Sequence, residues 1–186
     1  PGLKMIIPSD PYDAKGLLKS AIRDDNPVFC LESERLLSIK GEVPEGEYVI
    51  PIGEAVVRRP GTDCTLVAFG RTVYFCEQAA EELAKEGIDC EILDMRSIRP
   101  LDLDAIVRSV KKTNCCVVVD QSWSFASVGS EVAAEVHKAC FDDLDNHVHR
   151  VHNDDVPAPY SHELEQEMLP HARKICEAVR AATYNA

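Results

Sequence analysis

The sequence of 186 residues has no concentrated positive charge and no long apolar stretch. Its 20 Lys and Arg residues are outnumbered by 32 Asp and Glu residues, and its densest basic runs are pairs such as Lys111-Lys112. Nucleic-acid backbones are bound by clustered positive charge, so a nucleic-acid partner is disfavoured. The apolar stretches, such as residues 115–119, are far shorter than the roughly 20 residues that cross a bilayer, which argues against a membrane protein.

Several signatures of well-known sites are also absent. Neither G-x-G-x-x-G nor G-x-x-x-x-G-K-[ST] occurs, so a self-contained nucleotide site is poorly supported. The G-x-S-x-G nucleophile motif of α/β-hydrolases is missing as well. None of the eight cysteines forms C-x-x-C, and most fall in apolar runs, which indicates buried core thiols of a reducing compartment rather than a disulfide framework.

The first residue is Pro1, and neither a signal peptide nor an arginine-rich transit segment follows it. We therefore interpret the sequence as a processed chain or as a piece of a longer one.

Residues 1–47 read as one strand–helix–strand unit. A short strand over residues 3–7 is followed by Ser9-Asp10-Pro11, a cap and a proline that begin a one-sided helix. Asp24-Asp25-Asn26-Pro27 ends this helix, and a second strand follows over residues 28–31. Gly41, Pro44 and Gly46 then punctuate a polar connection, so we place a domain boundary near Tyr48.

Residues 48–186 alternate regularly between strands and helices. Strands are predicted over residues 65–70, 90–95, 115–120 and 147–152, and helices over 72–86, 102–112, 128–139 and about 170–182, with a polar loop before the last helix. Alternation of this kind gives parallel strands joined by right-handed crossovers. The prediction is an α/β domain with a doubly wound, mostly parallel sheet.

Three features invite a functional interpretation. Carbonyl groups at the end of the first helix, together with Asp24 and Asn26, supply oxygen ligands for a hard cation, although simple solvation of a helix end is favoured from the residues alone. His147, His149 and His152 could suggest zinc, but surface histidines are the commoner case. Trp123 is expected to anchor a loop or an interface.

Six blocks, in this order along the chain, resemble the beta subunits of pyruvate dehydrogenases, in the transketolase-like family of thiamin-diphosphate enzymes. The resemblance covers essentially the whole chain. The blocks are Pro1-Gly2-Leu3-Lys4, Pro11-Tyr12-Asp13-Ala14-Lys15-Gly16-Leu17-Leu18, Ala21-Ile22-Arg23-Asp24-Asp25-Asn26-Pro27-Val28, Ile50-Pro51-Ile52-Gly53, Ser97-Ile98-Arg99-Pro100-Leu101-Asp102 and Asp155-Val156-Pro157-Ala158-Pro159-Tyr160.

The resemblance implies that residues 1–47 close a pyrimidine-binding domain and that residues 48–186 form a transketolase C-terminal domain. It implies oxidative decarboxylation of pyruvate with acetyl transfer to a lipoyl group, in which an alpha subunit holds thiamin diphosphate and magnesium. The catalytic glutamate and histidine of such beta subunits precede the segment that resembles Pro1–Lys4. We therefore expect this chain to contain no catalytic and no cofactor-binding residue and to be inactive by itself.

The same resemblance implies a potassium site, formed by the main-chain carbonyls of Ala21, Ile22 and Asp24 and by the position of Asn26. It implies three partners: the alpha subunit, a second beta subunit, and the peripheral subunit-binding domain of a dihydrolipoyl acetyltransferase, with Asp145 on the docking face. The eight cysteines favour the mitochondrial matrix as the location over the alternative, a bacterial cytoplasm.

Two other interpretations stay open from the sequence. One is the beta subunit of a branched-chain 2-oxo acid dehydrogenase, although the blocks around Asn26 and Arg99 favour pyruvate. The other is a non-catalytic interaction domain of flavodoxin-like topology.

Overall fold

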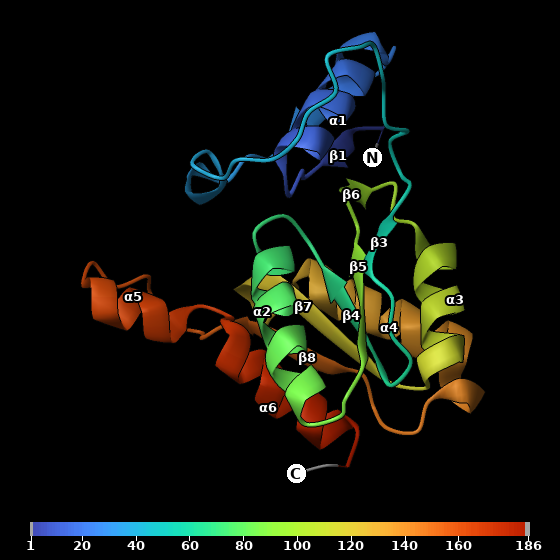
Figure 1. Ribbon diagram of the computed structural model, residues 1–186, viewed down its shortest axis with the longest axis vertical. Coiled ribbons are helices and arrows are strands. Elements are labelled where there is room, and N and C mark those ends of the chain that lie inside the picture. The colour runs from blue at the N-terminus through green and yellow to red at the C-terminus, as the bar shows by residue number, and fades with distance from the viewer. Residues whose placement is uncertain (1, 185–186) are drawn as a thin grey trace.

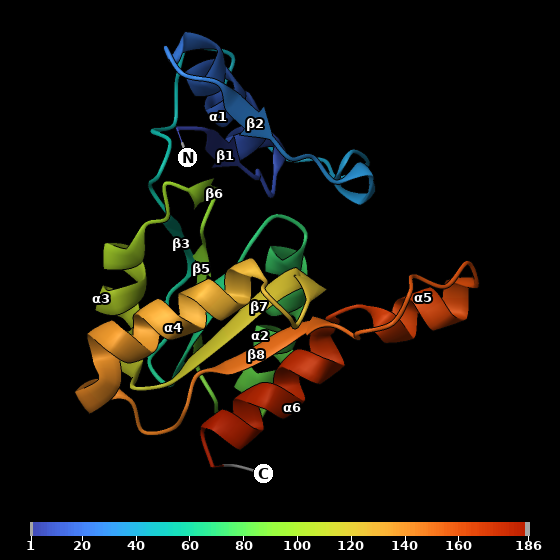
Figure 2. The ribbon, with the colours of Figure 1, turned by 180° about the vertical axis from the view of Figure 1, so that it is seen from behind.

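The computed structural model describes residues 2–184, so Pro1 of the first resembling block lies outside the described residues. A small three-stranded sheet with one helix lies over the carboxyl-terminal ends of the strands of a larger five-stranded sheet (Figures 1 and 2). The first sheet uses mainly the N-terminal residues, and the second uses the remainder of the chain.

The small sheet has the strand order β2-β1-β6. β1 (Lys4–Ile6) and β2 (Val28–Cys30) are parallel and are joined by α1 (Pro11–Arg23), which confirms the predicted strand–helix–strand unit. The Asp10 carboxylate caps α1 by accepting a hydrogen bond of 2.7 Å from the Asp13 N–H. The third strand, β6 (Ser97–Arg99), is antiparallel to β1 and was not predicted. Because β6 comes from the later part of the chain, it joins the two sheets covalently.

The large sheet has the order β3-β5-β4-β7-β8. β4 (Cys64–Ala68), β5 (Cys90–Asp94), β7 (Cys116–Trp123) and β8 (His149–Asn153) are parallel, which confirms the predicted doubly wound, mostly parallel arrangement. β3 (Val56–Arg59) adds an antiparallel edge strand. The sequence analysis missed this strand because it is short and only partly buried.

Helices cover both faces of the large sheet. α2 (Thr72–Lys85) and α6 (Ala172–Ala182) pack on one face, together with Leu66 and Val117. α3 (Leu103–Thr113) and α4 (Val128–Cys140) pack on the other face, together with Val67 and Val118. Side chains of a strand alternate between faces, so a strand buried on both sides is apolar throughout. This explains the unbroken apolar run of β7.

Short elements complete the chain: η1 (Glu34–Leu36), η2 (Phe141–Asp143) and α5 (His162–Met168). The polar loop predicted before the last helix contains a short helix that was not predicted, α5, which extends sideways from the large sheet (Figure 1). All eight cysteines are free, as expected for core thiols. None of the helices within residues 2–184 is long and apolar enough to cross a membrane.

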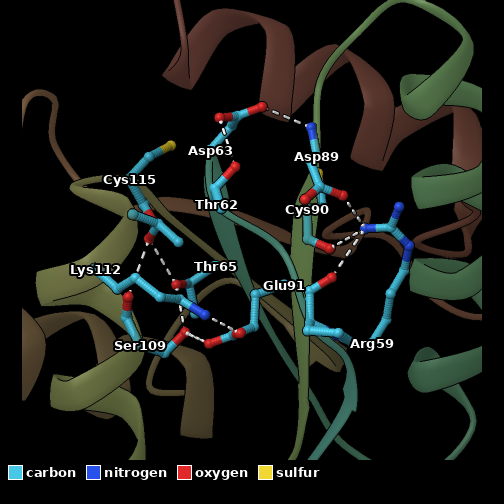
Figure 3. Close-up of polar contacts among 12 residues, drawn as sticks. Arg59, Thr62, Asp63, Thr65, Asp89, Cys90, Glu91, Ser109, Lys112 and Cys115 are labelled. Atoms are coloured by element: carbon cyan, nitrogen blue, oxygen red, sulfur yellow. Dashed lines mark hydrogen bonds and ion pairs between the residues drawn. The ribbon is translucent and has the colours of Figure 1, made fainter.

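A buried polar network fastens α3 to the amino-terminal ends of β4 and β5 (Figure 3). Glu91 accepts a hydrogen bond of 2.6 Å from the Ser109 hydroxyl and forms an ion pair with Lys112. The Thr65 hydroxyl lies 2.7 Å from both the Ser109 and the Thr113 hydroxyl. Since these groups satisfy one another, the network has the character of a structural fastening rather than of a reactive site.

Candidate functional site

The end of α1 is the candidate cation site. The helix ends at Arg23, and Asp24 leaves the helical conformation with a ψ of 138°. The last carbonyls of a helix have no partners within it, which leaves oxygen atoms of this turn available to a cation. One of them, the Ala21 carbonyl, accepts a long hydrogen bond of 3.4 Å from the Asp24 N–H.

The side chain of Asp24 is already engaged. It forms an ion pair with Lys4 of β1, and it accepts hydrogen bonds of 2.9 and 3.0 Å from the main-chain and side-chain nitrogens of Asn26. These contacts, the one to Lys4 above all, lower the pKa of Asp24 to about 2. They also explain why an acid is tolerated at the negative end of a helix. The turn therefore does not supply a free carboxylate, which leaves main-chain carbonyl oxygens as the candidate ligands.

A polar joint connects the two sheets at the carboxyl end of β5. The Arg96 guanidinium forms two hydrogen bonds with the fully buried carboxylate of Asp13, at 2.7 and 3.0 Å. Nearby, Arg58 of β3 donates to Asp10 at 2.6 Å. The Asp94 carboxylate accepts hydrogen bonds from the Ser9 hydroxyl and, at 3.1 Å, from the Arg96 N–H. Nothing in the sequence indicated these pairings.

Burial determines the pKa values of the acidic side chains in this joint. It raises the pKa of Asp94 to about 7, although the hydrogen bond from Ser9 acts to lower it, and repulsion by the neighbouring Asp13 adds to the increase. Burial also raises the pKa of Asp13, because desolvation outweighs the hydrogen bonds from Arg96. The joint thus holds three carboxyl groups, of Asp10, Asp13 and Asp94, against two guanidinium groups.

Asp145, predicted to lie on a docking face, is exposed at the opposite end of the large sheet. It lines a groove of 410 Å³ together with two exposed aromatic residues, Phe141 and Tyr184. The main chain of Asp145 is fixed, because its N–H donates to Asn114 O at 2.9 Å and its carbonyl accepts from the Tyr184 hydroxyl at 2.8 Å. No ion pair is formed by its carboxylate within the described part of the chain.

The remaining candidates are structural. The imidazole rings of His147 and His149 stack with their centroids 4.1 Å apart. Nowhere in residues 2–184 do three or more His, Cys, Asp or Glu side chains converge as a metal site. The Trp123 indole donates a hydrogen bond of 3.1 Å to Val156 O, which confirms the prediction that this side chain anchors a loop. The structure therefore separates the predicted cation turn from the predicted docking residue and leaves them at different ends of the molecule.

The model of the family described as "Transketolase, C-terminal domain" matches residues 53–175. The chain belongs to this family. The matched residues comprise the whole large sheet, from β3 to β8, and its four packing helices apart from the last turns of α6.

Curated relatives extend the similarity to the residues before the family match, which carry β1, α1 and β2 and are called the N-terminal unit below. The chain is 46% identical over 99% of its length to a pyruvate dehydrogenase E1 component subunit beta from Rhizobium meliloti, covering 40% of that protein. It is 45% identical over 98% of its length to the mitochondrial counterpart from Dictyostelium discoideum, covering 52%. A 2-oxoisovalerate dehydrogenase subunit beta from Bacillus subtilis is 44% identical over 97% of the chain and is covered to 56%. The chain thus spans about half the length of these relatives.

A solved structure shares the arrangement of both units. It is described as "Split gene transketolase, inactive beta4 tetramer", and it superposes with a TM-score of 0.81 at 26% identity. The superposition covers 99% of this chain and 58% of the other. The similarity to pyruvate dehydrogenase beta subunits that the sequence blocks indicated is therefore confirmed, as is the fold of a transketolase C-terminal domain.

Proposed function

We propose that the protein is the beta subunit of a pyruvate dehydrogenase, which decarboxylates pyruvate oxidatively and transfers the acetyl group to lipoyl groups. The observation that carries this proposal is identity of 44–46% to pyruvate dehydrogenase beta subunits over 97–99% of the chain. The blocks around Asn26 and Arg99 favour pyruvate over a branched-chain substrate. Relatives named for 2-oxoisovalerate and for acetoin, at 44% and 45% identity, define the competing substrates.

The test uses the complete protein paired with its alpha subunit. Reduction of the artificial acceptor 2,6-dichlorophenolindophenol, which reports oxidation of all three compounds, is measured with pyruvate, 3-methyl-2-oxobutanoate and acetoin under identical conditions. We expect the largest kcat/KM for pyruvate. A larger value for 3-methyl-2-oxobutanoate would assign the protein to branched-chain substrates and overturn the pyruvate proposal.

In this proposal residues 1–186 serve assembly and docking, while thiamin diphosphate and magnesium are held mainly by the alpha subunit. The glutamate and histidine that the resemblance assigns to catalysis precede the segment resembling Pro1–Lys4. We expect no decarboxylation when this chain alone is mixed with alpha subunit. Measurable turnover by that mixture would contradict the division of roles.

We further propose that the turn after α1 binds potassium through the carbonyls of Ala21, Ile22 and Asp24 and through the position of Asn26. Support comes from the end of the helix at Arg23 and from the carbonyls that this end releases. Melting temperatures of the complete protein are compared in KCl, NaCl and choline chloride at equal ionic strength. A specific increase in KCl is expected, and equal melting temperatures in the three salts would remove the site.

We propose that the surface around Asp145 binds a partner protein. The proposed partners are the alpha subunit, a second beta subunit, and the peripheral subunit-binding domain of a dihydrolipoyl acetyltransferase. An exposed carboxylate without an ion pair, beside Phe141 and Tyr184, suits a basic partner segment. Asp145→Arg is expected to weaken binding of the acetyltransferase domain by about tenfold or more. Glu163→Arg, the same charge change on α5, is the matched control, and equal affinity of all three proteins would exclude Asp145.

The proposed location is the mitochondrial matrix, with a bacterial cytoplasm as the alternative. Relatives of both kinds match the chain at similar identity. The upstream coding sequence distinguishes them, because a matrix protein is expected to carry an arginine-rich amphipathic transit segment.

A further inference from the structure

The large sheet reverses its winding beside β4. From β4 the chain crosses to β5 on one side, and from β5 it crosses back to β7 on the other side. A cavity of 260 Å³ lies at the carboxyl-terminal ends of these strands. Its floor is formed by the residues after β4 and the end of β7, and its roof is formed by Ile7, Pro8 and Leu36 of the N-terminal unit. In open α/β sheets this is the position at which ligands bind.

Arg71 lines this cavity and has no acceptor. Within residues 2–184 its guanidinium makes no hydrogen bond and no ion pair, and it lies over the ring of Phe75 with its central carbon 4.9 Å from the centroid. Partial burial lowers the pKa of Arg71, and repulsion by Arg35 acts in the same direction against the attraction of Glu165. The guanidinium remains charged at neutral pH because the ordinary pKa of arginine is so high. A partly buried guanidinium whose N–H groups have no acceptor is a ready binding group for an anion.

The other donors near the cavity are already used. In the first turn of α2, the Thr72 N–H donates to Phe69 O at 3.1 Å, and the Val73 N–H donates to Gly70 O at 3.2 Å. The Thr72 hydroxyl lies 3.0 Å from both Phe69 O and Val119 O. The helix terminus therefore does not present the set of free amides that cradles a phosphate.

Acidic groups limit the charge of the ligand. Glu32 and Asp120 also line the cavity. Asp120 is fixed by hydrogen bonds of 2.8 Å from the Gly129 N–H and the Ser122 hydroxyl, so its carboxylate cannot turn away. A dianion would be repelled by these two carboxylates while gaining only one guanidinium. A single negative charge in a planar group that matches the guanidinium fork is the best fit, and a carboxylate has this geometry.

Apolar side chains form most of the remaining wall. Phe69, Ile98 and Val128 contribute from the large-sheet side and face Ile7 and Pro8, while the uncharged polar residues of the lining are Ser33, Gln121 and Ser122. A volume of 260 Å³ admits a small molecule but not a nucleotide or a peptide. We propose that this cavity binds a small monocarboxylate with an aliphatic body, whose carboxylate contacts Arg71 and whose body packs against Phe69 and Ile98. The cavity shares no residue with the cation turn or with the Asp145 groove.

The experiment titrates 3-methylbutanoate into the full 186-residue chain and follows the amide signals of Gly70 and Ser122 and the side-chain signal of Arg71 by NMR. Saturable shifts at millimolar concentration are expected. The neutral analogue 3-methylbutan-1-ol has the same aliphatic body and is expected not to saturate over the same range.

Two variants test the role of the charge. Arg71→Gln is expected to weaken binding by about tenfold or more, whereas Arg173→Gln, which removes an exposed guanidinium from α6, is expected to leave it unchanged. Contacts between the ligand methyl groups and those of Ile98 and Val128, detected by nuclear Overhauser effects in the unmodified chain, locate the ligand without any substitution. Equal binding of the alcohol, equal binding by Arg71→Gln, or the absence of saturable shifts would each overturn the proposal.

Discussion

Asp13 of α1 and Arg96 of the segment between β5 and β6 form a two-point ion pair across the boundary between the two sheets. The Asp13 side chain is completely buried, and that of Arg96 is 13% exposed. The two residues are 83 positions apart in the sequence. The pair therefore fixes the N-terminal unit to the loop that follows a central strand of the large sheet.

Removing one partner leaves a buried charge without a counter-charge. Asp13→Asn and Arg96→Gln are each expected to lower the free energy of unfolding by about 3 kcal/mol. The double variant should lose less than the sum of the two, because neither buried charge then remains alone. Urea unfolding of all four proteins measures this coupling. Glu167→Gln, which removes an exposed pair with Arg173, serves as the control and should change stability by at most about 0.5 kcal/mol.

Asp94 makes stability depend on pH near neutrality. Its pKa in the folded protein is about 7, well above its value of 3.8 in an unfolded chain. The folded state therefore binds more protons between these values, and the free energy of unfolding must fall as pH rises from about 4 to 7. The raised pKa of Asp13 acts in the same direction.

We expect urea midpoints of the wild-type chain to be lower at pH 8 than at pH 5.5. Asp94→Asn cannot ionise and still accepts the Ser9 hydrogen bond, so its midpoint should change less over this interval. Asp24→Asn is a useful comparison because Asp24, with a pKa of about 2, does not titrate between these two pH values. An equal pH dependence of wild type and Asp94→Asn would show that Asp94 is ionised throughout.

Gly61 lies where β4 approaches the neighbouring strand. A Cβ atom at this position would collide with the main chain of Cys90 and Glu91, which cannot move aside as a flexible side chain could. Gly61→Ala is therefore expected to destabilise the protein by several kcal/mol, in the upper range for single substitutions. Gly46→Ala is the matched control, since a Cβ there meets nothing within 4 Å. Thermal unfolding of both variants makes the comparison.

The network around Glu91 gives a fourth prediction. Glu91→Ala leaves the Ser109 hydroxyl without its acceptor and Lys112 without its carboxylate, so a loss of about 3 kcal/mol is expected. Ser109→Ala removes one donor while the ion pair with Lys112 remains, so its effect should be about 1 kcal/mol. If Glu91→Ala proved as mild as Ser109→Ala, the network would contribute little to stability.

The sequence predicted the elements with strong periodicity. Residues 72–86 give α2 because apolar residues recur at helical spacing and Gly87 follows with a φ of 85°. The run 115–119 gives a central strand because it is apolar on both faces. β3 and β6 were missed because each is only three or four residues long and gains its hydrogen bonds from distant strands.

The sites were predictable to different degrees. The end of α1 could be located because a cap, a proline and Asn26-Pro27 define both ends of the helix. The joint of Asp13, Asp94 and Arg96 could not, since it depends on residues brought together by the stacking of two sheets. The Arg71 cavity was not predicted, because nothing in the local sequence shows that an arginine lacks a hydrogen-bond acceptor.

The pairing of β6 with β1 determines what would happen if the chain were produced as two separate pieces. A cut at residues 47/48 would remove the third strand of the small sheet, because Ser97–Arg99 pair with β1 yet remain joined to the other half. The same cut would separate Ile50 from Leu17, with which it forms the only apolar core found for the small unit within the described chain. The N-terminal piece would lose both, whereas residues 48–186 would keep the whole large sheet, so residues 1–47 should be recovered folded only when the other piece is produced with them, as a non-covalent pair.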